Sequence, residues 1–193
     1  MPAVSSSLNS SARYVITGGP FSGKTSLVRA LAARGYATIP EAAISVIEDL
    51  TNELGLEGQA AWRAANPGAF QERIIQKQLV FESRAHPAGP VFLDRGRLDG
   101  VAYCRVYGSE IPAALAFACS ELPYDKVFLL DTLHAFERRH GSGRTSDRER
   151  SLVIRNALRA EYTARGLTPI EVPELPLVER VDFVLAELSP ARA

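Results

Sequence analysis

A glycine-rich segment directly follows a short apolar stretch, Tyr14–Thr17, near the start of the chain. It reads Gly18-Gly19-Pro20-Phe21-Ser22-Gly23-Lys24-Thr25 and matches the pattern Gly-x-x-x-x-Gly-Lys-Ser/Thr at every fixed position. Glycines let such a loop curl so that successive backbone N–H groups face a phosphate, and the N-terminus of a following helix adds positive charge. The segment therefore predicts a strand, a phosphate-binding loop and a helix, in that order.

The residue types in this loop indicate a magnesium nucleotide. Lys24 is expected to reach the β- and γ-phosphates, and the Thr25 hydroxyl is expected to ligate Mg²⁺. The alternative is a glycine-rich turn between strand and helix with an incidental lysine. We expect ATP or GTP as the nucleotide, together with Mg²⁺. ATP is favoured as the cofactor, because the guanine-binding string Asn-Lys-x-Asp does not occur in the sequence. The expected nucleotide-binding residues are Gly18, Gly19, Pro20, Phe21, Ser22, Gly23, Lys24, Thr25 and Ser26.

Short apolar runs alternate with longer helical patterns along the rest of the chain. The runs predict five strands, at Tyr14–Thr17, Tyr36–Pro40, Val91–Leu93, Lys126–Leu130 and Pro169–Val172. Strands separated by helices favour a parallel sheet with right-handed crossovers, covered by helices on both faces. The predicted fold class is therefore α/β, a three-layer sandwich around a five-stranded parallel sheet.

The helices are predicted from apolar spacing and from residues that begin or end helices. The first follows the phosphate loop and ends at Gly35, and the segment Gly55–Gly68, which contains Trp62, is expected to be a loop or a broken helix. A capping box at Ser146 and Glu149 predicts the start of a helix that ends at Gly166. The other predicted helices are Glu41–Leu54, Phe70–Ser83, Gly96–Tyr107, Pro112–Ser120 and 177–188.

Composition excludes several classes of protein and of partner. The 193 residues contain 22 Lys and Arg against 22 Asp and Glu, so the whole molecule has no net attraction for nucleic acid or an anionic membrane. No apolar run reaches about 18 residues, no signal peptide is recognisable, and the two cysteines lack metal-ligand spacing, so we expect a cytoplasmic protein. Residues 1–12 are predicted to be a flexible leader, and 13–190 a single domain.

Polar residues at the ends of two predicted strands are candidate catalytic residues. Val91-Phe92-Leu93-Asp94-Arg95-Gly96 is similar to the strand-Asp/Glu-Arg motif of nucleoside and nucleotide kinases. Asp94 is expected to hold Mg²⁺ through water or to accept a substrate proton, and its alternative is to cap the next helix. Arg95 would stabilise the transferring phosphate, or form a structural ion pair. Glu41 would orient or deprotonate an acceptor hydroxyl, or simply begin a helix.

The order of these segments resembles a wider family. VITGGPFSGKT, IPEAA around Glu41, NPGAFQERIIQKQ, VFLDRGRLDGVAYC, Gly143-Arg144-Thr145 and Val181-Asp182-Phe183 are similar to the AAA-type, nicotinamide-riboside-kinase-like P-loop ATPases. The resemblance covers nearly all of the chain after the leader. It implies the strand order 2-3-1-4-5 and a P-loop NTPase fold. Neither Asp94 nor Asp131 is followed by glutamate, which disfavours a motor-type ATPase.

An arginine-rich segment, about 134–150, is predicted to be a lid over the triphosphate. Its glycines make it flexible, and Arg144 is the expected phosphate contact and candidate catalytic residue. The alternative is a solvated basic loop. RNA binding is disfavoured because no aromatic residues alternate with the arginines.

Three further residues are candidates for an acceptor site. Asp99 lies one helical turn beyond Arg95, and Gln78 and Trp62 are candidates to line the pocket. A solvated helix position for Asp99 and a packed tryptophan are the alternatives. The sequence as a whole favours an ATP- and Mg²⁺-dependent kinase for a small hydroxylated, nucleoside- or nucleotide-like acceptor. A P-loop ATPase acting as a hydrolase or switch is the second hypothesis, and a nucleotide-binding module without catalysis is the third.

Overall fold

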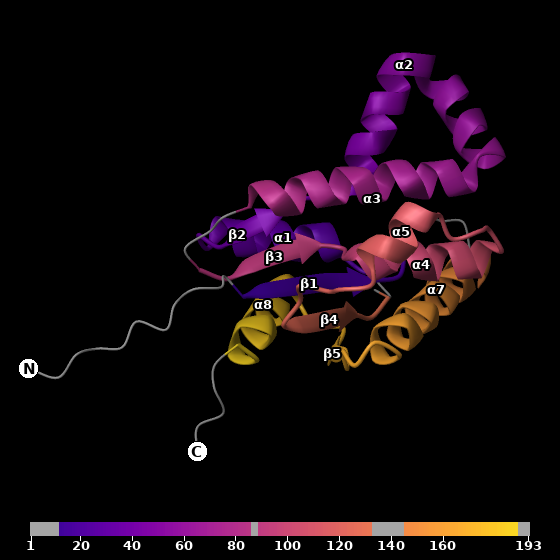
Figure 1. The fold of residues 1–193 in the computed structure, drawn as a ribbon. Coiled ribbons are helices and arrows are strands. Elements are labelled where there is room, and N and C mark those ends of the chain that lie inside the picture. The colour runs from indigo at the N-terminus through magenta and orange to yellow at the C-terminus, as the bar shows by residue number, and fades with distance from the viewer. Residues whose placement is uncertain (1–11, 86–88, 133–144, 189–193) are drawn as a thin grey trace, which may run out of the picture.

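The computed structural model describes residues 12–85, 89–132 and 145–188. Within them, five parallel strands form one sheet between two layers of helices (Figure 1). The strands are β1 (Arg13–Gly18), β2 (Ala37–Ile39), β3 (Val91–Asp94), β4 (Lys126–Leu130) and β5 (Ile170–Val172). Their order in the sheet is β2-β3-β1-β4-β5. The predicted α/β class, the parallel sheet and its 2-3-1-4-5 order are confirmed.

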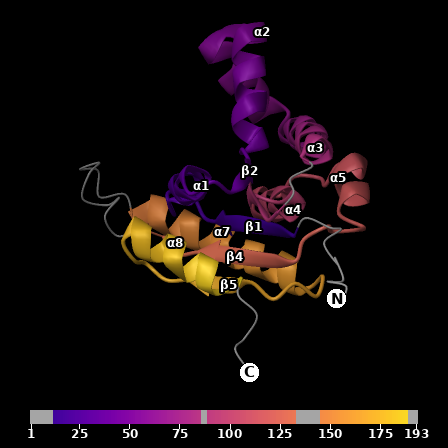
Figure 2. The same cartoon turned by 90° about the vertical axis from the view of Figure 1, so that its left-hand side faces the viewer.

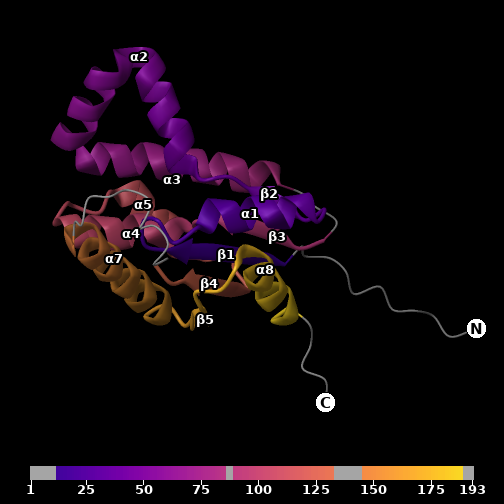
Figure 3. The ribbon, with the colours of Figure 1, turned by 180° about the vertical axis from the view of Figure 1, so that it is seen from behind.

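One face of the sheet is covered by α1 (Lys24–Ala33) and α8 (Leu177–Ala186), which lie side by side (Figure 3). Successive side chains of a strand point to opposite faces. Tyr14 and Ile16 of β1 therefore pack with Leu27 of α1 in this layer, and Val15 points to the other. Both faces of β1 are apolar because both are buried, which explains the absence of alternation in its sequence.

The opposite face carries four helices and the larger of the two apolar cores. They are α3 (Pro67–Arg84), α4 (Arg97–Tyr107), α5 (Ala113–Ala118) and α7 (Thr145–Thr163). Leu98, Leu115 and Leu158, from three of these helices, are completely buried in it. Most of the predicted helices are therefore present, with ends that differ by a few residues. α3 begins earlier than expected because Pro67 is well suited to a first helical turn.

Helix α2 (Ala42–Ala65) projects away from the sheet and its two layers (Figure 2). It bends at Gly55, whose φ of 75° and ψ of 173° are not helical. The chain then continues as helix to Ala65 and turns at Asn66 into α3. The expectation of a loop over Gly55–Gly68 is wrong, and the alternative of a broken helix is right. Trp62 lies in the second half of α2.

The carboxyl ends of β1 and β3 place the phosphate loop beside Asp94. The two strands are neighbours, and Ile16 pairs with Asp94 in the register. Ligands of open parallel sheets bind at this edge. Within the described ranges, no helix is both long and apolar enough to cross a membrane. Residues 1–11 of the predicted leader lie outside the described residues, as do 189–190 at the expected end of the domain.

Candidate active site

The phosphate loop (Gly18–Thr25) bends sharply between β1 and α1. Gly23 has a φ of 81°, a left-handed conformation that glycine adopts without steric cost. Gly19 is needed for a different reason, because a Cβ there would lie 2.3 Å from Ser151 Oγ of α7. The Ser151 hydroxyl also donates a hydrogen bond of 2.9 Å to the carbonyl of Pro20. The loop is therefore packed tightly against α7, a contact that its motif does not reveal.

Lys24 is folded back into the loop and is almost fully buried. Its Nζ donates to the carbonyl of Gly19 at 2.7 Å and to Ser22 Oγ at 3.2 Å. Burial lowers its pKa to about 7, and the charge of Arg95 adds to this effect, which Glu41 and two aspartates partly oppose. The ammonium group thus binds a backbone and a hydroxyl oxygen of the loop, at the place where the motif predicts a phosphate.

Asp94 ends β3 and is 2% exposed. Its Oδ2 accepts a hydrogen bond of 2.8 Å from the hydroxyl of Thr25, and Oδ1 is buried without a hydrogen-bond partner. Burial raises the pKa of Asp94, and Glu41 raises it further, against the Thr25 hydrogen bond and two nearby cations. Asp94 does not cap α4, which begins after Gly96. A hydroxyl and a carboxylate with a free oxygen are ligand types that suit Mg²⁺.

Arg95 turns the chain directly after Asp94. Its φ of 77° is left-handed, a strained conformation for a residue with a Cβ and one that often marks functional sites. Its Nε donates to Glu41 Oε1 at 2.8 Å, and its guanidinium lies 5.3 Å from the centre of the Tyr103 ring. Burial alone would lower the pKa of Arg95, but Tyr103, Glu41 and Asp99 together raise it. Arg95 therefore stays charged in this buried position.

Asp99 is buried rather than solvated. Its Oδ2 accepts a hydrogen bond of 2.7 Å from the Thr17 hydroxyl, and its Oδ1 accepts one of 2.8 Å from the Tyr162 hydroxyl. Arg95 Nη1 lies 3.4 Å from Oδ2. Asp99 thus joins β1, α4 and α7, and together with Glu41 it holds the guanidinium of Arg95.

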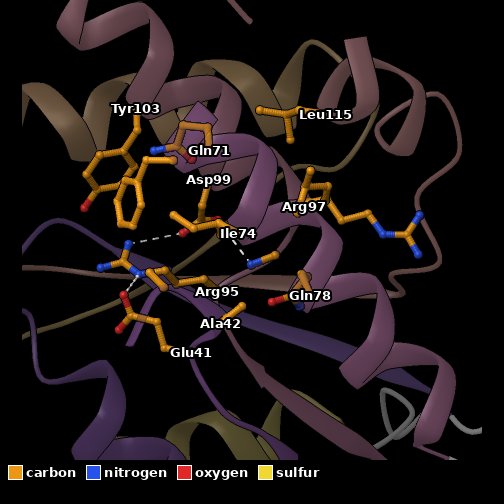
Figure 4. A pocket seen from close by; sticks show the side chains of 15 residues that line it. Glu41, Ala42, Gln71, Ile74, Gln78, Arg95, Arg97, Asp99, Tyr103 and Leu115 are labelled. Atoms are coloured by element: carbon orange, nitrogen blue, oxygen red, sulfur yellow. Dashed lines mark hydrogen bonds and ion pairs between the residues drawn. The ribbon is translucent and has the colours of Figure 1, made fainter. Parts of the chain in front are cut away.

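A cavity of about 130 Å³ opens beside Arg95, between α2, α3 and α4 (Figure 4). Figure 4 shows Arg95 between Glu41 and Asp99, with Gln78 and Arg97 farther along the cavity. The cavity combines a few polar groups with apolar and aromatic walls, as small-molecule sites do. Its lining residues are Glu41, Ala42, Ala43, Phe70, Gln71, Ile74, Ile75, Gln78, Arg95, Gly96, Arg97, Asp99, Gly100, Tyr103 and Leu115.

Of the three candidate acceptor residues, two line this cavity. Gln78 is buried, and its Nε2 donates to Glu82 Oε1 at 3.0 Å, so the amide is held in place. Asp99 forms part of the wall. Trp62 does not line the cavity, and its ring packs 4.9 Å from the guanidinium carbon of Arg73. The contacts of Trp62 therefore agree with the alternative of a packed tryptophan.

Most of the predicted lid, 134–144, lies outside the described residues, and Arg144 is one of these residues. α7 begins immediately afterwards, at Thr145. At its start, the Arg150 guanidinium carbon lies 5.1 Å from the centre of the Tyr107 ring of α4. Arg150 therefore packs against the helix that carries Tyr103, a residue of the cavity wall.

Comparison with known proteins decides the family. A family model described as an AAA domain (AAA_28) matches residues 13–180. The chain belongs to this AAA-domain family. The match covers most of the sequence and includes the phosphate loop, Asp94 and the cavity, so the family resemblance inferred from the sequence is confirmed. No curated protein sequence matched the chain.

Solved structures similar to this AAA domain, among them two kinases, show that it has the P-loop NTPase fold. NadR in complex with NAD and AMP-PNP has 18% identity and a TM-score of 0.61, over 95% of this chain and 51% of NadR. Thymidylate kinase from Candida albicans has 14% identity and a TM-score of 0.61, over 92% and 91% of the two chains. Deoxyadenosine kinase from M. mycoides has 13% and 0.60, over 91% and 97%. The chain spans about half the length of NadR and nearly all of the other two.

The site of the AAA domain also contains residues that the sequence analysis did not single out. Phe70, Gln71 and Ile74 line the cavity with Gln78. Phe70, Ile74 and Gln78 follow one another at intervals of four residues and so share one face of α3. A glutamine on this otherwise apolar face was the sequence feature that could have indicated a polar cavity. Ser151 of α7 and Arg180 of α8 contact the phosphate loop from outside, and no local motif marks either residue.

Proposed function

We propose that the protein is an ATP- and Mg²⁺-dependent kinase that transfers the γ-phosphoryl group to a hydroxyl of a small nucleoside- or nucleotide-like acceptor. One observation carries this proposal: of two consecutive residues, the first contacts the phosphate loop and the second lines the cavity. Asp94 holds Thr25 of the phosphate loop, and Arg95 lines the cavity. A nucleotide on the loop and an acceptor in the cavity would meet at this pair. A hydrolase needs only water at that position and has no use for a cavity with polar and aromatic walls.

The phosphate loop supplies the nucleotide side of the proposed reaction. The triphosphate would lie against the N-terminus of α1 and place its negative charge beside Lys24. Among the described residues, no group of three or more His, Cys, Asp and Glu could hold a metal by itself. Thr25 and Asp94 suit Mg²⁺ nonetheless, since this ion is commonly held by one or two protein oxygens together with phosphates and water. When bound, Mg²⁺ would neutralise charge on the β- and γ-phosphates.

The cavity supplies the acceptor side. Glu41 Oε1 is hydrogen-bonded to Arg95, and an acceptor hydroxyl placed beside Glu41 would find a carboxylate able to orient it and accept its proton. Arg95 would then be close enough to stabilise charge on the transferring phosphoryl group. Gln71 and Gln78 offer amides that can recognise the polar edge of an acceptor. We assign Arg144 to the nucleotide side, as a lid residue, and place the enzyme in the cytoplasm.

An acceptor screen tests the proposal. Purified protein is incubated with Mg·ATP and single acceptors, including nicotinamide riboside, thymidine, thymidine monophosphate and deoxyadenosine, and ADP release is measured. We expect one acceptor class to raise ADP release at least tenfold and to yield a phosphorylated product. Lys24→Ala should remove this turnover. ADP release that ignores every small acceptor and responds only to a macromolecule would instead favour the regulatory ATPase.

A further inference from the structure

The two buried side-chain atoms without a hydrogen-bond partner, among the described residues, belong to Asp94 and Arg180. Both residues contact the phosphate loop. Asp94 approaches through Thr25, and Arg180 of α8 approaches from the other side, where its Nη1 donates to the carbonyl of Ser22 at 3.1 Å. Asp94 is explained by the proposed Mg²⁺ site, whereas Arg180 has no role so far.

Burial of the Arg180 guanidinium at this position costs desolvation free energy. The residue is 5% exposed, and its Nε is buried without a hydrogen-bond partner among the described residues. Burial lowers the pKa of its guanidinium, and the charge of Glu174 only partly opposes this effect. A buried guanidinium with an unpaired Nε destabilises a fold unless its charge or its remaining hydrogen bond is needed.

The hydrogen bond to Ser22 fixes the direction of one peptide group in the loop. A trans peptide is planar, so its C=O and N–H point in opposite directions. Arg180 holds the Ser22 carbonyl from outside the loop, and the N–H of Gly23, in the same peptide, must then point the opposite way. Phosphate loops bind anions through N–H groups that point inward. Ser151 holds the carbonyl of Pro20 from α7 in a similar manner.

We propose that Arg180 is a positioning residue for nucleotide binding, which holds the Ser22–Gly23 peptide so that the N–H of Gly23 faces the phosphates. This inference rests on the proposed nucleotide binding at the loop. Its charge also acts on the loop from a dry environment, where it is weakly screened. α8, the last helix described, thereby contributes to a site formed near the beginning of the chain.

The test compares Arg180→Met with wild type in the affinity for Mg·AMP-PNP, measured by calorimetry, and in the unfolding midpoint without nucleotide. We expect the dissociation constant to rise about tenfold or more. The midpoint should change little, because methionine fills similar volume and removes a buried guanidinium whose Nε has no hydrogen-bond partner among the described residues. Arg34→Met is the matched control, since Arg34 pairs with Asp182 of α8 on the surface, and its affinity should equal that of wild type.

Arg180→Lys separates positioning from general packing. It keeps the charge and one donor near Ser22, so its affinity should lie between those of wild type and Arg180→Met. If the methionine variant does not fold, a rise of at least threefold in the lysine variant supports the proposal, and a wild-type value overturns it. Unchanged affinity in Arg180→Met, or a loss fully matched by a fall in stability, also overturns it. Wild-type protein that does not bind Mg·AMP-PNP refutes the proposed function and this inference together.

Discussion

The hydroxyl of Thr25 donates a hydrogen bond of 2.8 Å to Asp94, a residue 69 positions away in the chain. This bond joins the first turn of α1 to the end of β3. It brings two side-chain oxygens together, while the second carboxylate oxygen of Asp94 has no hydrogen-bond partner among the described residues. The relationship explains why the phosphate-loop motif specifies a hydroxyl after the lysine, and why an aspartate ends the neighbouring strand.

Replacement of Thr25 by valine should abolish most Mg²⁺-dependent turnover while leaving the fold intact. The side chain keeps its shape but loses the oxygen that Asp94 binds. We expect kcat to fall about a hundredfold or more, by analogy with the loss of one transition-state hydrogen bond or ligand. Thr25→Ser keeps the hydroxyl and should stay within a few-fold of wild type. The measurement is turnover as a function of Mg²⁺ concentration, and identical curves for the two variants would contradict the assignment.

Glu41→Gln should lower kcat by about a hundredfold, with little change in the affinity for ATP. The amide keeps the volume of the side chain but cannot accept a proton from the acceptor. Because Glu41 lies on the cavity side of Arg95, the nucleotide side should be undisturbed. Glu57→Gln, an exposed position on the same helix, is the control and should match wild type. Steady-state kinetics and calorimetry separate the two effects, and a loss of ATP affinity alone would argue against a role as base.

Gly19→Ala should weaken nucleotide binding by at least tenfold and lower the unfolding midpoint. The added Cβ would lie 2.3 Å from Ser151 Oγ and 2.4 Å from its carbonyl oxygen, so the loop or α7 must move. Overpacking of this kind typically costs about 1–3 kcal/mol. Gly89→Ala is the control, since a Cβ at Gly89 meets no atom within 4 Å. Thermal unfolding and nucleotide titration provide the readouts, and a Gly19 variant as stable as the control would show that the contact with Ser151 is loose.

Cys119 should make the protein less stable in alkaline solution. Burial raises the pKa of its thiol to about 11 from an ordinary value of 9.0, with opposing effects from Arg165 and Arg97. The unfolded chain therefore releases this proton before the folded one does. The contribution of the protonated, buried thiol to the unfolding free energy is fully present below pH 9 and is lost as the pH rises toward 11. Between these values, the unfolding free energy of wild type should fall more steeply than that of Cys119→Ala, as denaturant titrations at each pH can measure. Parallel curves would show that the thiol is accessible to solvent.

Much of the phosphate-loop region could be predicted from sequence because its residues are close together in the chain. The phosphate loop is one continuous segment, and Asp94 and Arg95 follow a strand whose apolar run is easily recognised. The strand order came from the family resemblance. The bent helix α2 was uncertain because Gly55 interrupts its periodicity, and a single glycine is compatible with either a kink or a loop.

The cavity was less predictable because its walls come from four helices, α2, α3, α4 and α5. Gln71 and Tyr103 become neighbours of Arg95 only through tertiary packing. Ser151 and Arg180 reach the loop from helices more than a hundred residues away in the chain, at separations of 131 and 158. Trp62, an attractive candidate as the only tryptophan, packs on Arg73 instead. Pattern within a short window carries no information about such contacts.

The left-handed backbone of Arg95 separates two tasks along a single peptide bond. Asp94 and the phosphate loop lie at the carboxyl edge of the sheet, whereas most of the cavity wall comes from helices α2, α3, α4 and α5. In the proposed kinase, substitutions in those helices would change the acceptor that the cavity takes and would leave the phosphate loop and Asp94 in place. The choice of acceptor and the transfer of phosphate would then be separate properties, each open to change on its own.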